Sequence, residues 1–367
     1  MTKYSDAEHG FFPHGMSRRD FCERVSRCGG LLVGGRELLN AFPAEPSALN
    51  MESELVFACD GGSTQRIFET EFFPEFYQRY GVKITYVPGQ NADILAKLRI
   101  QRRSPSIDVV WLAGGNTYEA IDGGLLMELD RSLVPNYALV APEAGQEKVA
   151  APVGVSVCGV AYNTRVFAEK GFSRPSSWWD LWDAKYKGHV GLYSINVTAT
   201  TAMLVKVAQI LTGDYKNIDP AFRKFSELRP NMLDFFTSAG AWETEMQEGD
   251  FWIGENTSVR GMQLRKSNVG FTLPKEGVVG YQTWVGVVKN APHPRAAHAW
   301  VNYLLSTEGQ EKMLRRIGYI PVNPQAKVPE DLAYFFPSLK TVFIPDWRYL
   351  ARQLPYFVER WNREVEE

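Results

Sequence analysis

Strands and helices alternate between residues 55 and 113, and this alternation constrains the fold more than any other feature of the sequence. The apolar segments Leu55–Cys59, 82–88 and 106–113 are predicted strands, and segments with apolar residues near helical spacing lie between them. A βαβαβ order predicts a parallel sheet with helices on both faces. Ligands of such sheets bind beyond the carboxyl ends of the strands. Gly61-Gly62 and Gly114-Gly115 follow two of the three strands at those ends.

The two glycine turns leave two interpretations open. Neither completes Gly-x-Gly-x-x-Gly, and GGST at 61–64 lacks the spacing and the lysine of a phosphate-binding loop, which argues against a nucleotide. One interpretation is that glycine only permits tight strand-to-helix turns. The other is that exposed N–H groups at a helix start bind an anionic or carbonyl group. Ser63 is predicted to cap the first helix, and Thr307 with Gln310 matches a capping box later in the chain.

A second set of strands and helices lies between two long extended runs, Val153–Tyr162 and Thr283–Lys289. The sequence therefore predicts two αβ lobes joined by a double-strand hinge, which close around a small ligand bound between them. We expect lobe 1 at 51–160 plus 285–330, lobe 2 at 161–284, and C-terminal helices bridging the lobes at 331–367. The predicted elements of lobe 2 are strands Val190–Tyr193 and Phe251–Gly254 and helices Ala199–Leu211, Asp219–Leu228, Ala241–Gln247 and Ser258–Leu264.

Composition excludes several classes of function. The chain of 367 residues has a net charge of −2 and no basic stripe, so no nucleic-acid partner is expected. No stretch of about 18 apolar residues is present, so the sequence predicts no membrane span. The five histidines lack metal-ligand spacing, and no nucleophile is paired with a base. We therefore expect no metal, no cofactor and no catalytic residue, and we expect Cys59 and Cys158 to stay unbridged.

Residues 17–22, Ser-Arg-Arg-Asp-Phe-Cys, resemble the twin-arginine export signal. A weakly apolar, glycine-rich stretch follows, and the small residues at 44–48 suggest cleavage near Ala48. We therefore expect residues 1–50 to be an export signal and the mature protein to be periplasmic. The alternative is an N-terminal tail in which Arg18 and Arg19 are incidental.

Three further segments resemble one protein family, the extracellular solute-binding proteins of ABC importers, in their spermidine/putrescine-binding branch. The segments are AYNT at 161–164, RPSSWWDLWDAKYKGHVGL at 174–192 and NAPHPRAAHAWVNYLLSTEGQEKM at 290–313. The resemblance covers essentially the whole mature chain. It implies a periplasmic binding protein-like type II α/β fold. It also implies export and the capture of a small polar molecule for delivery to a membrane permease and its ATPase. No lipobox cysteine follows a general signal, so we expect a free periplasmic monomer.

The sequence departs from polyamine binders of this family where they place acids and aromatic rings. Thr283 stands at an acidic position of the second hinge, Thr-Ala-Thr-Thr at 198–201 replaces acids at a helix start, and 61–64 replaces an aromatic pair. Arg348 stands for a glutamine, and its planar fork suits a carboxylate, phosphonate or phosphate. Glu255 is suited to an ammonium group.

The resulting expectation is a small polar organic molecule, namely an organic acid, a phosphonate or an amino-acid-like zwitterion. A polyamine remains an alternative. A ferric ion is a weaker alternative, because related ferric binders use adjacent tyrosines and no Tyr-Tyr pair is present. The candidate ligand-binding residues lie at the glycine turns, on the extended runs and at helix starts. They are Gly62, Ser63, Thr64, Gly114, Gly115, Asn116, Ser156, Asn196, Glu255, Tyr281, Thr283, Trp284 and Arg348.

The charged and aromatic candidates also have simpler interpretations. Arg348 suits a surface ion pair, Glu255 suits a hinge or helix-cap carboxylate, and Tyr281 and Trp284 suit core aromatic positions. The tryptophans of the 174–192 segment are predicted to pack in a core rather than to form a sugar-binding platform, because two of them share one helical face. They are Trp178, Trp179 and Trp182.

Overall fold

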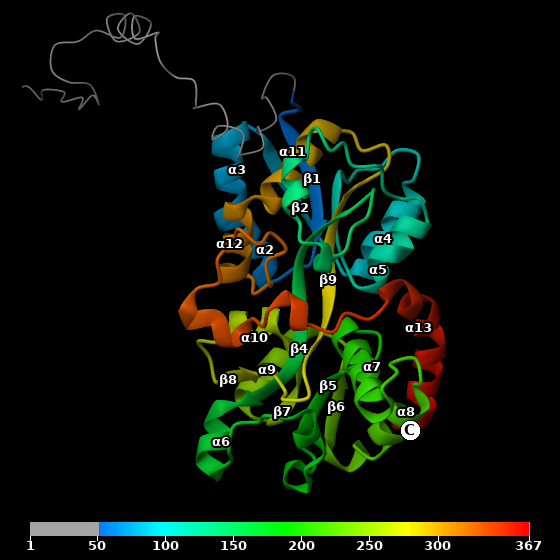
Figure 1. Cartoon of the computed structure of the whole chain (residues 1–367), viewed down its shortest axis with the longest axis vertical. Helices are drawn as coiled ribbons and strands as arrows, with labels where there is room; N and C mark the ends of the chain where they lie inside the picture. Colours follow the sequence, from blue (N-terminus) through cyan, green and yellow to red (C-terminus); the bar gives the residue numbers. More distant parts are fainter. Residues whose placement is uncertain (1–50, 367) are drawn as a thin grey trace, which may run out of the picture. The chain divides into compact units, whose positions relative to one another are not determined.

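The computed structural model describes residues 51–366, and the predicted export signal at 1–50 lies outside the described residues. Within 51–366, nine strands form one sheet in the order β2-β1-β3-β9-β4-β7-β5-β6, with β8 paired to β4 (Figure 1). Strands β6 and β8 are additional to those predicted; β6 has the sequence MLDFF and β8 the sequence VGFT. The strands are β1 (Glu54–Cys59), β2 (Lys83–Pro88), β3 (Val109–Ala113), β4 (Ala151–Asn163), β5 (Val190–Tyr193), β6 (Met232–Phe236), β7 (Ile253–Thr257), β8 (Val269–Thr272) and β9 (Val279–Val287).

The sheet combines parallel and antiparallel strands. Strand β1 pairs in parallel with β2 and β3, which confirms the parallel arrangement predicted from the βαβαβ order. Strand β9 is antiparallel to β3, and β4 is antiparallel to both β9 and β7. The sheet is therefore mixed, because the strands that carry the chain between its two halves run in opposite directions and lie beside each other.

Strands β4 and β9 connect the two halves of the sheet. One end of β9 pairs with β4, where Val279 lies opposite Cys158, and the other end pairs with β3, where Val287 lies opposite Val109. Strand β4 continues into the second half, where its last residues pair with β7. The two extended runs of the sequence are thus neighbouring strands, and Figure 1 shows them side by side between the two groups of helices.

Helices cover both faces of the sheet in each half (Figure 1). Five-residue π-helical segments follow α2 and α13, at Phe68–Phe72 and Asn362–Glu366. The helices are α2 (Ser63–Ile67), α3 (Phe73–Tyr80), α4 (Asn91–Ile100), α5 (Gly115–Asp122), α6 (Thr164–Lys170), α7 (Thr198–Thr212), α8 (Asp219–Ser226), α9 (Ala239–Glu248), α10 (Ser258–Leu264), α11 (Pro294–Leu305), α12 (Thr307–Arg316) and α13 (Trp347–Trp361).

Two predicted helix caps are wrong. Helix α2 begins at Ser63 itself, and its N-cap is Gly62, whose φ of 75° lies in the region that favours glycine. Helix α12 is capped by Ser306, whose hydroxyl accepts a backbone N–H of the first turn. The side chain of Gln310 is buried and donates to two backbone carbonyls instead of closing a capping box with Thr307. Tertiary hydrogen bonds thus determine the position of Gln310.

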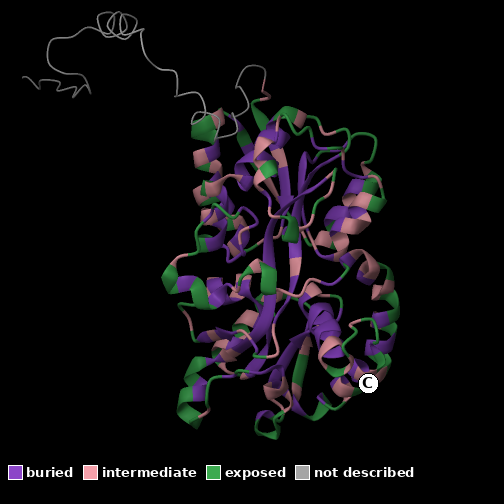
Figure 2. Cartoon of the chain, in the orientation of Figure 1, coloured by how far each residue is buried: buried purple, intermediate pink, exposed green. Residues whose placement is uncertain are grey.

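Three buried clusters form the core, and Figure 2 shows them along the strands and the inward faces of the helices. Two lie on opposite faces of β1, β3 and β9, and the third surrounds β5 and β7, so each half of the sheet has its own core. Trp178 is fully buried, as predicted, and Cys59 and Cys158 are buried free thiols. Representative residues are Phe57, Trp111 and Trp300 in the first cluster, Leu98, Leu112 and Trp284 in the second, and Trp178, Phe225 and Trp361 in the third.

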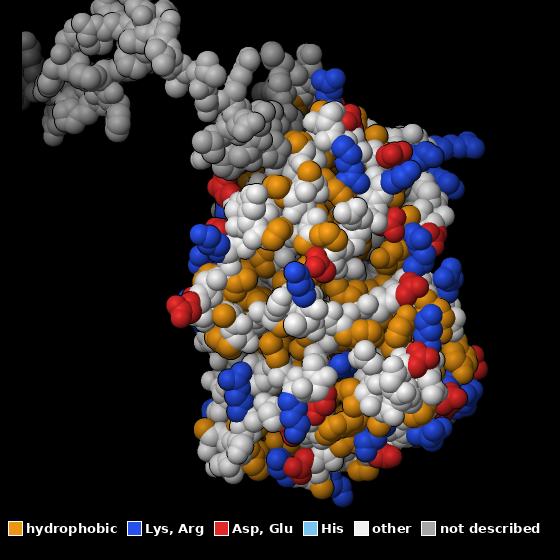
Figure 3. All heavy atoms as spheres, viewed as in Figure 1, with side chains coloured by type: hydrophobic (Ala, Val, Ile, Leu, Met, Phe, Trp, Pro, Cys, Tyr) orange, Lys and Arg blue, Asp and Glu red, His pale blue; other side chains and the backbone are white. Residues whose placement is uncertain are grey.

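The surface carries charges of both signs. On the face shown in Figure 3, Lys and Arg side chains alternate with Asp and Glu side chains, and apolar side chains lie between them. This mixture agrees with the net charge of −2 and contains no stripe of a single sign on that face. Among residues 51–366, no helix has both the length and the apolar character needed to cross a membrane.

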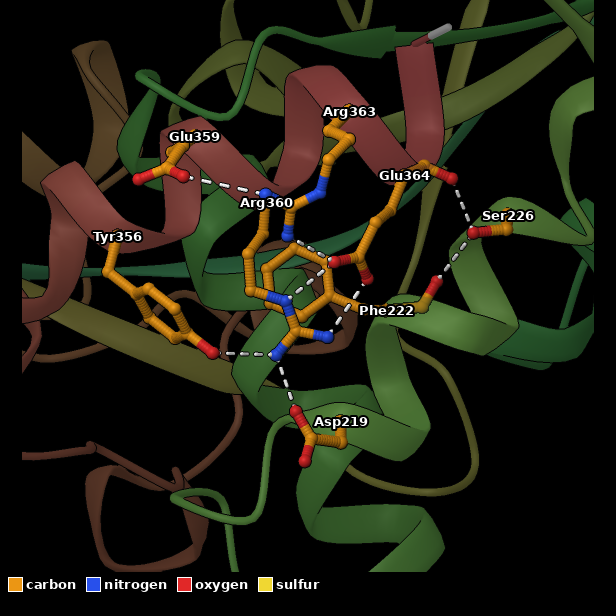
Figure 4. Close-up of polar contacts among 8 residues, drawn as sticks. All are labelled: Asp219, Phe222, Ser226, Tyr356, Glu359, Arg360, Arg363 and Glu364. Carbon is orange, nitrogen blue, oxygen red and sulfur yellow. Dashed lines mark hydrogen bonds and ion pairs between the residues drawn. The ribbon is translucent and has the colours of Figure 1, made fainter.

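Helix α13 is fixed to α8 by a network around Arg360 (Figure 4). The guanidinium group of Arg360 pairs with Asp219, donates to both oxygens of Glu364 (3.0 and 2.9 Å), and lies 4.1 Å from the ring centroid of Phe222. Its side chain is only 11% exposed, so water screens these contacts weakly. The first turns of α13 pack against α5, which belongs to the other half of the sheet. The approach is close: a Cβ added to Gly115 of α5 would lie 3.0 Å from the Cβ of Ala351.

We predict that Arg360→Met lowers the free energy of unfolding by about 1–3 kcal/mol. The variant removes charge-assisted hydrogen bonds and leaves the carboxylates of Asp219 and Glu364 without this partner. Hydrogen bonds from Arg360 lower the pKa of Glu364 to about 2, so this stabilisation is present above about pH 4.5 and is lost as the pH falls towards 2. Urea denaturation from neutral to acidic pH measures both effects. Arg363→Met, at a side chain 58% exposed, is the matched control and should cost less than about 1 kcal/mol. Equal losses for the two variants would contradict the prediction.

Candidate ligand-binding site

The candidate site begins at the middle of the β4–β9 pair. Ser156 of β4 lies directly opposite Tyr281 of β9, and Thr283 lies two residues further along β9 on the same face. On the other side of β4, Glu255 of β7 lies opposite Val160. Because β4 and β9 belong to both halves of the sheet, these positions are adjacent to both lobes.

Buried polar atoms without a partner concentrate on these strands. Across residues 51–366, ten buried side-chain polar atoms make no hydrogen bond, and seven of them are on β4, β5, β7 and β9. Buried polar groups normally have partners, so such a concentration marks a place where a polar molecule can be bound. The seven atoms are Ser156 Oγ, Tyr193 OH, Glu255 Oε2, Asn256 Nδ2, Gln282 Oε1, Thr283 Oγ1 and Trp284 Nε1.

Glu255 is held in place through one of its two carboxyl oxygens. Oε1 accepts hydrogen bonds from the backbone N–H of Tyr193 (2.8 Å) and the hydroxyl of Thr200 (2.5 Å). The side chain is fully buried, and burial raises the pKa of Glu255 to about 8, although these two hydrogen bonds oppose the rise. Glu255 thus joins β7 to β5 and to the start of α7, while Oε2 remains available.

Asp60 of one half and Arg260 of the other half affect each other electrostatically. Asp60 follows β1, and its Oδ1 accepts from the amide of Asn91 at the start of α4 (3.3 Å). Arg260 lies in the first turn of α10, 3.2 Å from the carboxylate of Glu243, and donates to Gln263 (2.8 Å). Burial raises the pKa of Asp60, and the positive charge of Arg260 partly offsets the rise. The two charges are therefore close enough to interact.

Two tyrosines, Tyr281 and Tyr319, lie near Asp60. Burial raises the pKa of Tyr281 and of Tyr319, and the negative charge of Asp60 adds to both rises. The ring of Tyr281 also packs edge-on against Trp347 at the start of α13, with centroids 5.9 Å apart. The site thus combines opposite charges, hydroxyl groups and aromatic walls.

Sequence reasoning missed several of these residues. Asp60, Arg260, Tyr193, Asn256 and Tyr319 are not among the predicted candidates. A usable signal was present for two of them: Asp60 is the first residue after β1, and Arg260 lies in the first turn of the helix after β7. Charges at the carboxyl ends of strands lie where ligands bind in α/β sheets.

The predicted residues of the first glycine turn lie at the start of α2. Gly62 turns the chain, and the Ser63 hydroxyl accepts from Arg66 of the same helix (3.2 Å). Thr64 is buried, and its hydroxyl lies 3.5 Å from the amide nitrogen of Gln263 on α10. This turn therefore contacts the helix that carries Arg260.

The second glycine turn lies against α7 and α13. A crevice with about 30 Å³ of free volume is lined by the predicted residues Gly115, Asn116 and Asn196 together with Thr198 and Trp347. A Cβ added to Gly114 would lie 2.9 Å from Cγ2 of Thr198 and 3.3 Å from Cε3 of Trp347, so only glycine permits this approach. Gly114 also has a φ of 53°, which favours glycine.

Arg348 lies on α13 outside the β4–β9 pair, whereas Trp284 is on β9 and its indole Nε1 is one of the buried atoms without a hydrogen bond. Arg348 contacts Asp122 (Nε to Oδ1, 3.4 Å) and Glu147 (3.3 Å), and its guanidinium carbon lies 5.0 Å from the ring centroid of Tyr118. Trp284 is buried in the core cluster on one face of β1 and β3. In residues 51–366, no group of three or more His, Cys, Asp or Glu side chains is placed to hold a metal ion.

The chain belongs to the family of bacterial extracellular solute-binding proteins, whose profile matches residues 71–334. It is 27% identical over 318 residues to spermidine/putrescine-binding periplasmic protein 1 of Haemophilus influenzae, covering 81% of this chain and 86% of that protein. It is 23% identical over 305 residues to a Salmonella typhi protein assigned to 2-aminoethylphosphonate binding, covering 80% and 86%.

Solved structures show the same fold. A periplasmic binding protein from Actinobacillus pleuropneumoniae, determined with fructose-6-phosphate, superimposes with a TM-score of 0.70 at 21% identity, covering 86% of this chain and 99% of that chain. The predicted two-lobe type II α/β fold is therefore confirmed. So is the predicted resemblance to solute-binding proteins of ABC importers.

We predict that Gly114→Ala forces the two lobes apart, because the new methyl group overlaps Thr198 and Trp347. The radius of gyration from small-angle X-ray scattering should increase. Gly213→Ala is the matched control: Gly213 also has a positive φ, 80°, but a Cβ there meets no atom within 4 Å. Both variants should lose about 1–2 kcal/mol of stability from backbone strain. The same radius of gyration for both would show that Gly114 does not limit the approach of the lobes.

Proposed function

We propose that the protein captures a small organic molecule carrying both an oxyanion and an amine in the space between its lobes. The bound molecule is then delivered to a membrane permease and its ATPase, and the protein acts as a monomer without turnover of its ligand. The observation that carries the proposal is that Arg260 of one half lies close enough to Asp60 of the other for its positive charge to offset the raised pKa of Asp60. A zwitterion can pair with both charges at once.

Arg260 and the unpartnered donors support an anionic group on the ligand. The guanidinium fork suits a carboxylate or phosphonate. The amide of Asn256 and the hydroxyls of Tyr193, Ser156 and Thr283 add hydrogen-bond donors that make no well-formed hydrogen bond within residues 51–366, although Asn256 lies near Tyr193, Ser156 near Tyr281 and Thr283 near Tyr319. A donor-rich site with a positive charge favours an oxyanion over a second ammonium group.

Asp60 supports an amine on the other end of the ligand. Its carboxylate is oriented by Asn91, and the rings of Tyr281 and Tyr319 lie close enough for the charge of Asp60 to raise their pKa values. A carboxylate beside aromatic faces is a favourable environment for an ammonium group. This pairing places the amine near the carboxyl end of β1.

The relatives include proteins named for two classes of amine-containing ligand. One is assigned to 2-aminoethylphosphonate, which carries one amine and one phosphonate, and another binds spermidine and putrescine, which carry amines only. Arg260 favours the first class, because a polyamine would place a second positive charge beside the guanidinium group. A polyamine is therefore the second candidate. Ferric binding has less support, since the described acids and histidines form no cluster.

The other predicted candidates take supporting positions in this proposal. The turns at Gly62–Thr64 and Gly114–Asn116, with Asn196, form the rim at which the lobes meet. Arg348 holds α13 to lobe 1 through Asp122 and Glu147 rather than contacting the ligand. We also propose the lobe boundaries at 51–160 plus 285–330 and at 161–284, with α13 bridging them.

We predict that Arg260→Gln weakens binding of 2-aminoethylphosphonate at least about tenfold, which corresponds to about 1.4 kcal/mol. Isothermal titration calorimetry measures the affinity, with putrescine and succinate as comparison ligands that each lack one of the two charges. Arg265→Gln is the matched control, because Arg265 lies just beyond the same helix and donates to a backbone carbonyl. Tighter binding of putrescine than of 2-aminoethylphosphonate would overturn the zwitterion assignment.

We propose that the protein reaches the periplasm by the twin-arginine route. The supporting pattern is Ser-Arg-Arg-Asp-Phe at 17–21. Replacing both Arg18 and Arg19 by Lys should leave a longer precursor in the cytoplasm, measured by fractionation and immunoblotting. The matched control replaces Arg24 and Arg27 by Lys, which keeps the same charge change outside the motif. Equal export of the two double variants would contradict this route.

A further inference from the structure

The two oxygens of the Glu255 carboxyl group have different surroundings. Oε1 accepts two hydrogen bonds, from the Tyr193 N–H and the Thr200 hydroxyl. Oε2 is buried and has no hydrogen-bond partner within residues 51–366. An ionised carboxylate with a bare buried oxygen is costly. The group must therefore either keep its proton or meet a positively charged atom of a bound molecule.

The groups that face Glu255 supply no positive charge. Cys158 on β4 and Tyr193 on β5 lie close enough for the negative charge of Glu255 to raise their pKa values, and α7 contributes only the hydroxyl of Thr200. Arg260 of α10 and Glu243 of α9 affect Tyr193, but neither shifts the pKa of Glu255. Burial raises that pKa to about 8, so the protonated form prevails at neutral pH.

We infer that Glu255 binds the ligand's oxyanion in its protonated form, with the Oε2–H as a hydrogen-bond donor. This inference rests on the proposed function and specifies which end of the ligand Glu255 recognises. It makes Glu255 a specificity-determining residue. When protonated, Glu255 supplies a hydrogen-bond donor beside those of Tyr193 and Asn256. When ionised, it would repel the oxyanion of the ligand. The site then selects an oxyanion at this end and rejects a second ammonium group.

The inference can be tested with the mature protein and Glu255→Gln, which retains a donor but cannot ionise. In the wild type, affinity for 2-aminoethylphosphonate should fall about tenfold for each pH unit above about 8, and the variant should lack this decline. Calorimetry in buffers of different protonation enthalpy should show about one proton taken up on binding near pH 9 by the wild type, and none attributable to the site in the variant. Titration of the ligand itself is common to both proteins and cancels in the comparison.

A ligand-free measurement keeps the test independent of binding. The wild type should lose stability relative to Glu255→Gln as the pH rises from about 4.5 to 8, because the raised pKa disfavours the ionised folded state, and the difference should level off above that range. Urea denaturation measures this, with Glu143→Gln at an exposed position as the control. A constant difference between wild type and Glu255→Gln would overturn the inference.

The outcomes distinguish this inference from the proposed function. Binding of 2-aminoethylphosphonate with proton release between about pH 6 and 8 would mean that Glu255 ionises to meet the amine, which overturns the inference and leaves the zwitterion proposal standing. Preferential binding of putrescine, with loss of that binding in Glu255→Gln, overturns both. Proton uptake confined to the wild type supports the inference.

Discussion

The antiparallel pairing of β4 with β9 is the constraint on which the rest of the structure depends. Both strands belong to both halves of the sheet, so residues at their middle, Ser156 and Tyr281, are adjacent to each lobe. The pairing is irregular between Pro152 and Gly154, where a Cβ on Gly154 would lie 2.6 Å from Tyr319. The β4–β9 pairing is thus irregular next to Tyr319, whose pKa is raised by the charge of Asp60. Because both strands run through both lobes, motion between the lobes would shift the residues of the candidate site.

Local patterns in the sequence predicted the elements well and the contacts between them poorly. Val190–Tyr193 and Ser258–Leu264 have the predicted bounds, because a buried strand and an apolar helix face are encoded over a few neighbouring residues. The cap at Ser306 and the buried amide of Gln310 differ from the prediction, because tertiary packing determines which side chain reaches a free N–H. Periodicity carries no information about such choices.

The site was only partly predictable for the same reason. Glu255 was a candidate because it aligns with a ligand-contacting position of the resembled family, whereas Arg260 lies on a helix, where most arginines are solvated. Asp60 and Arg260 are 200 positions apart in the sequence, so no local sequence pattern predicts that their charges interact. The two carboxyls also differ in environment: a guanidinium group offsets the burial of Asp60, whereas only hydrogen bonds offset that of Glu255. Residue type alone therefore does not determine which acid is ionised.

Helix α13 is tied to both halves of the structure, so closure of the lobes must strain one of its two attachments. At its start, Arg348 contacts Asp122 and Glu147 at distances above 3.2 Å, and its side chain is 38% exposed. At its end, Arg360 is 11% exposed and Trp361 is fully buried. Exposed ion pairs contribute about 0–1 kcal/mol, whereas a buried tryptophan and a shielded guanidinium contribute several times more. The attachment through Arg348 is the weaker one, so we expect α13 to stay with the half that contains α8 if the lobes move.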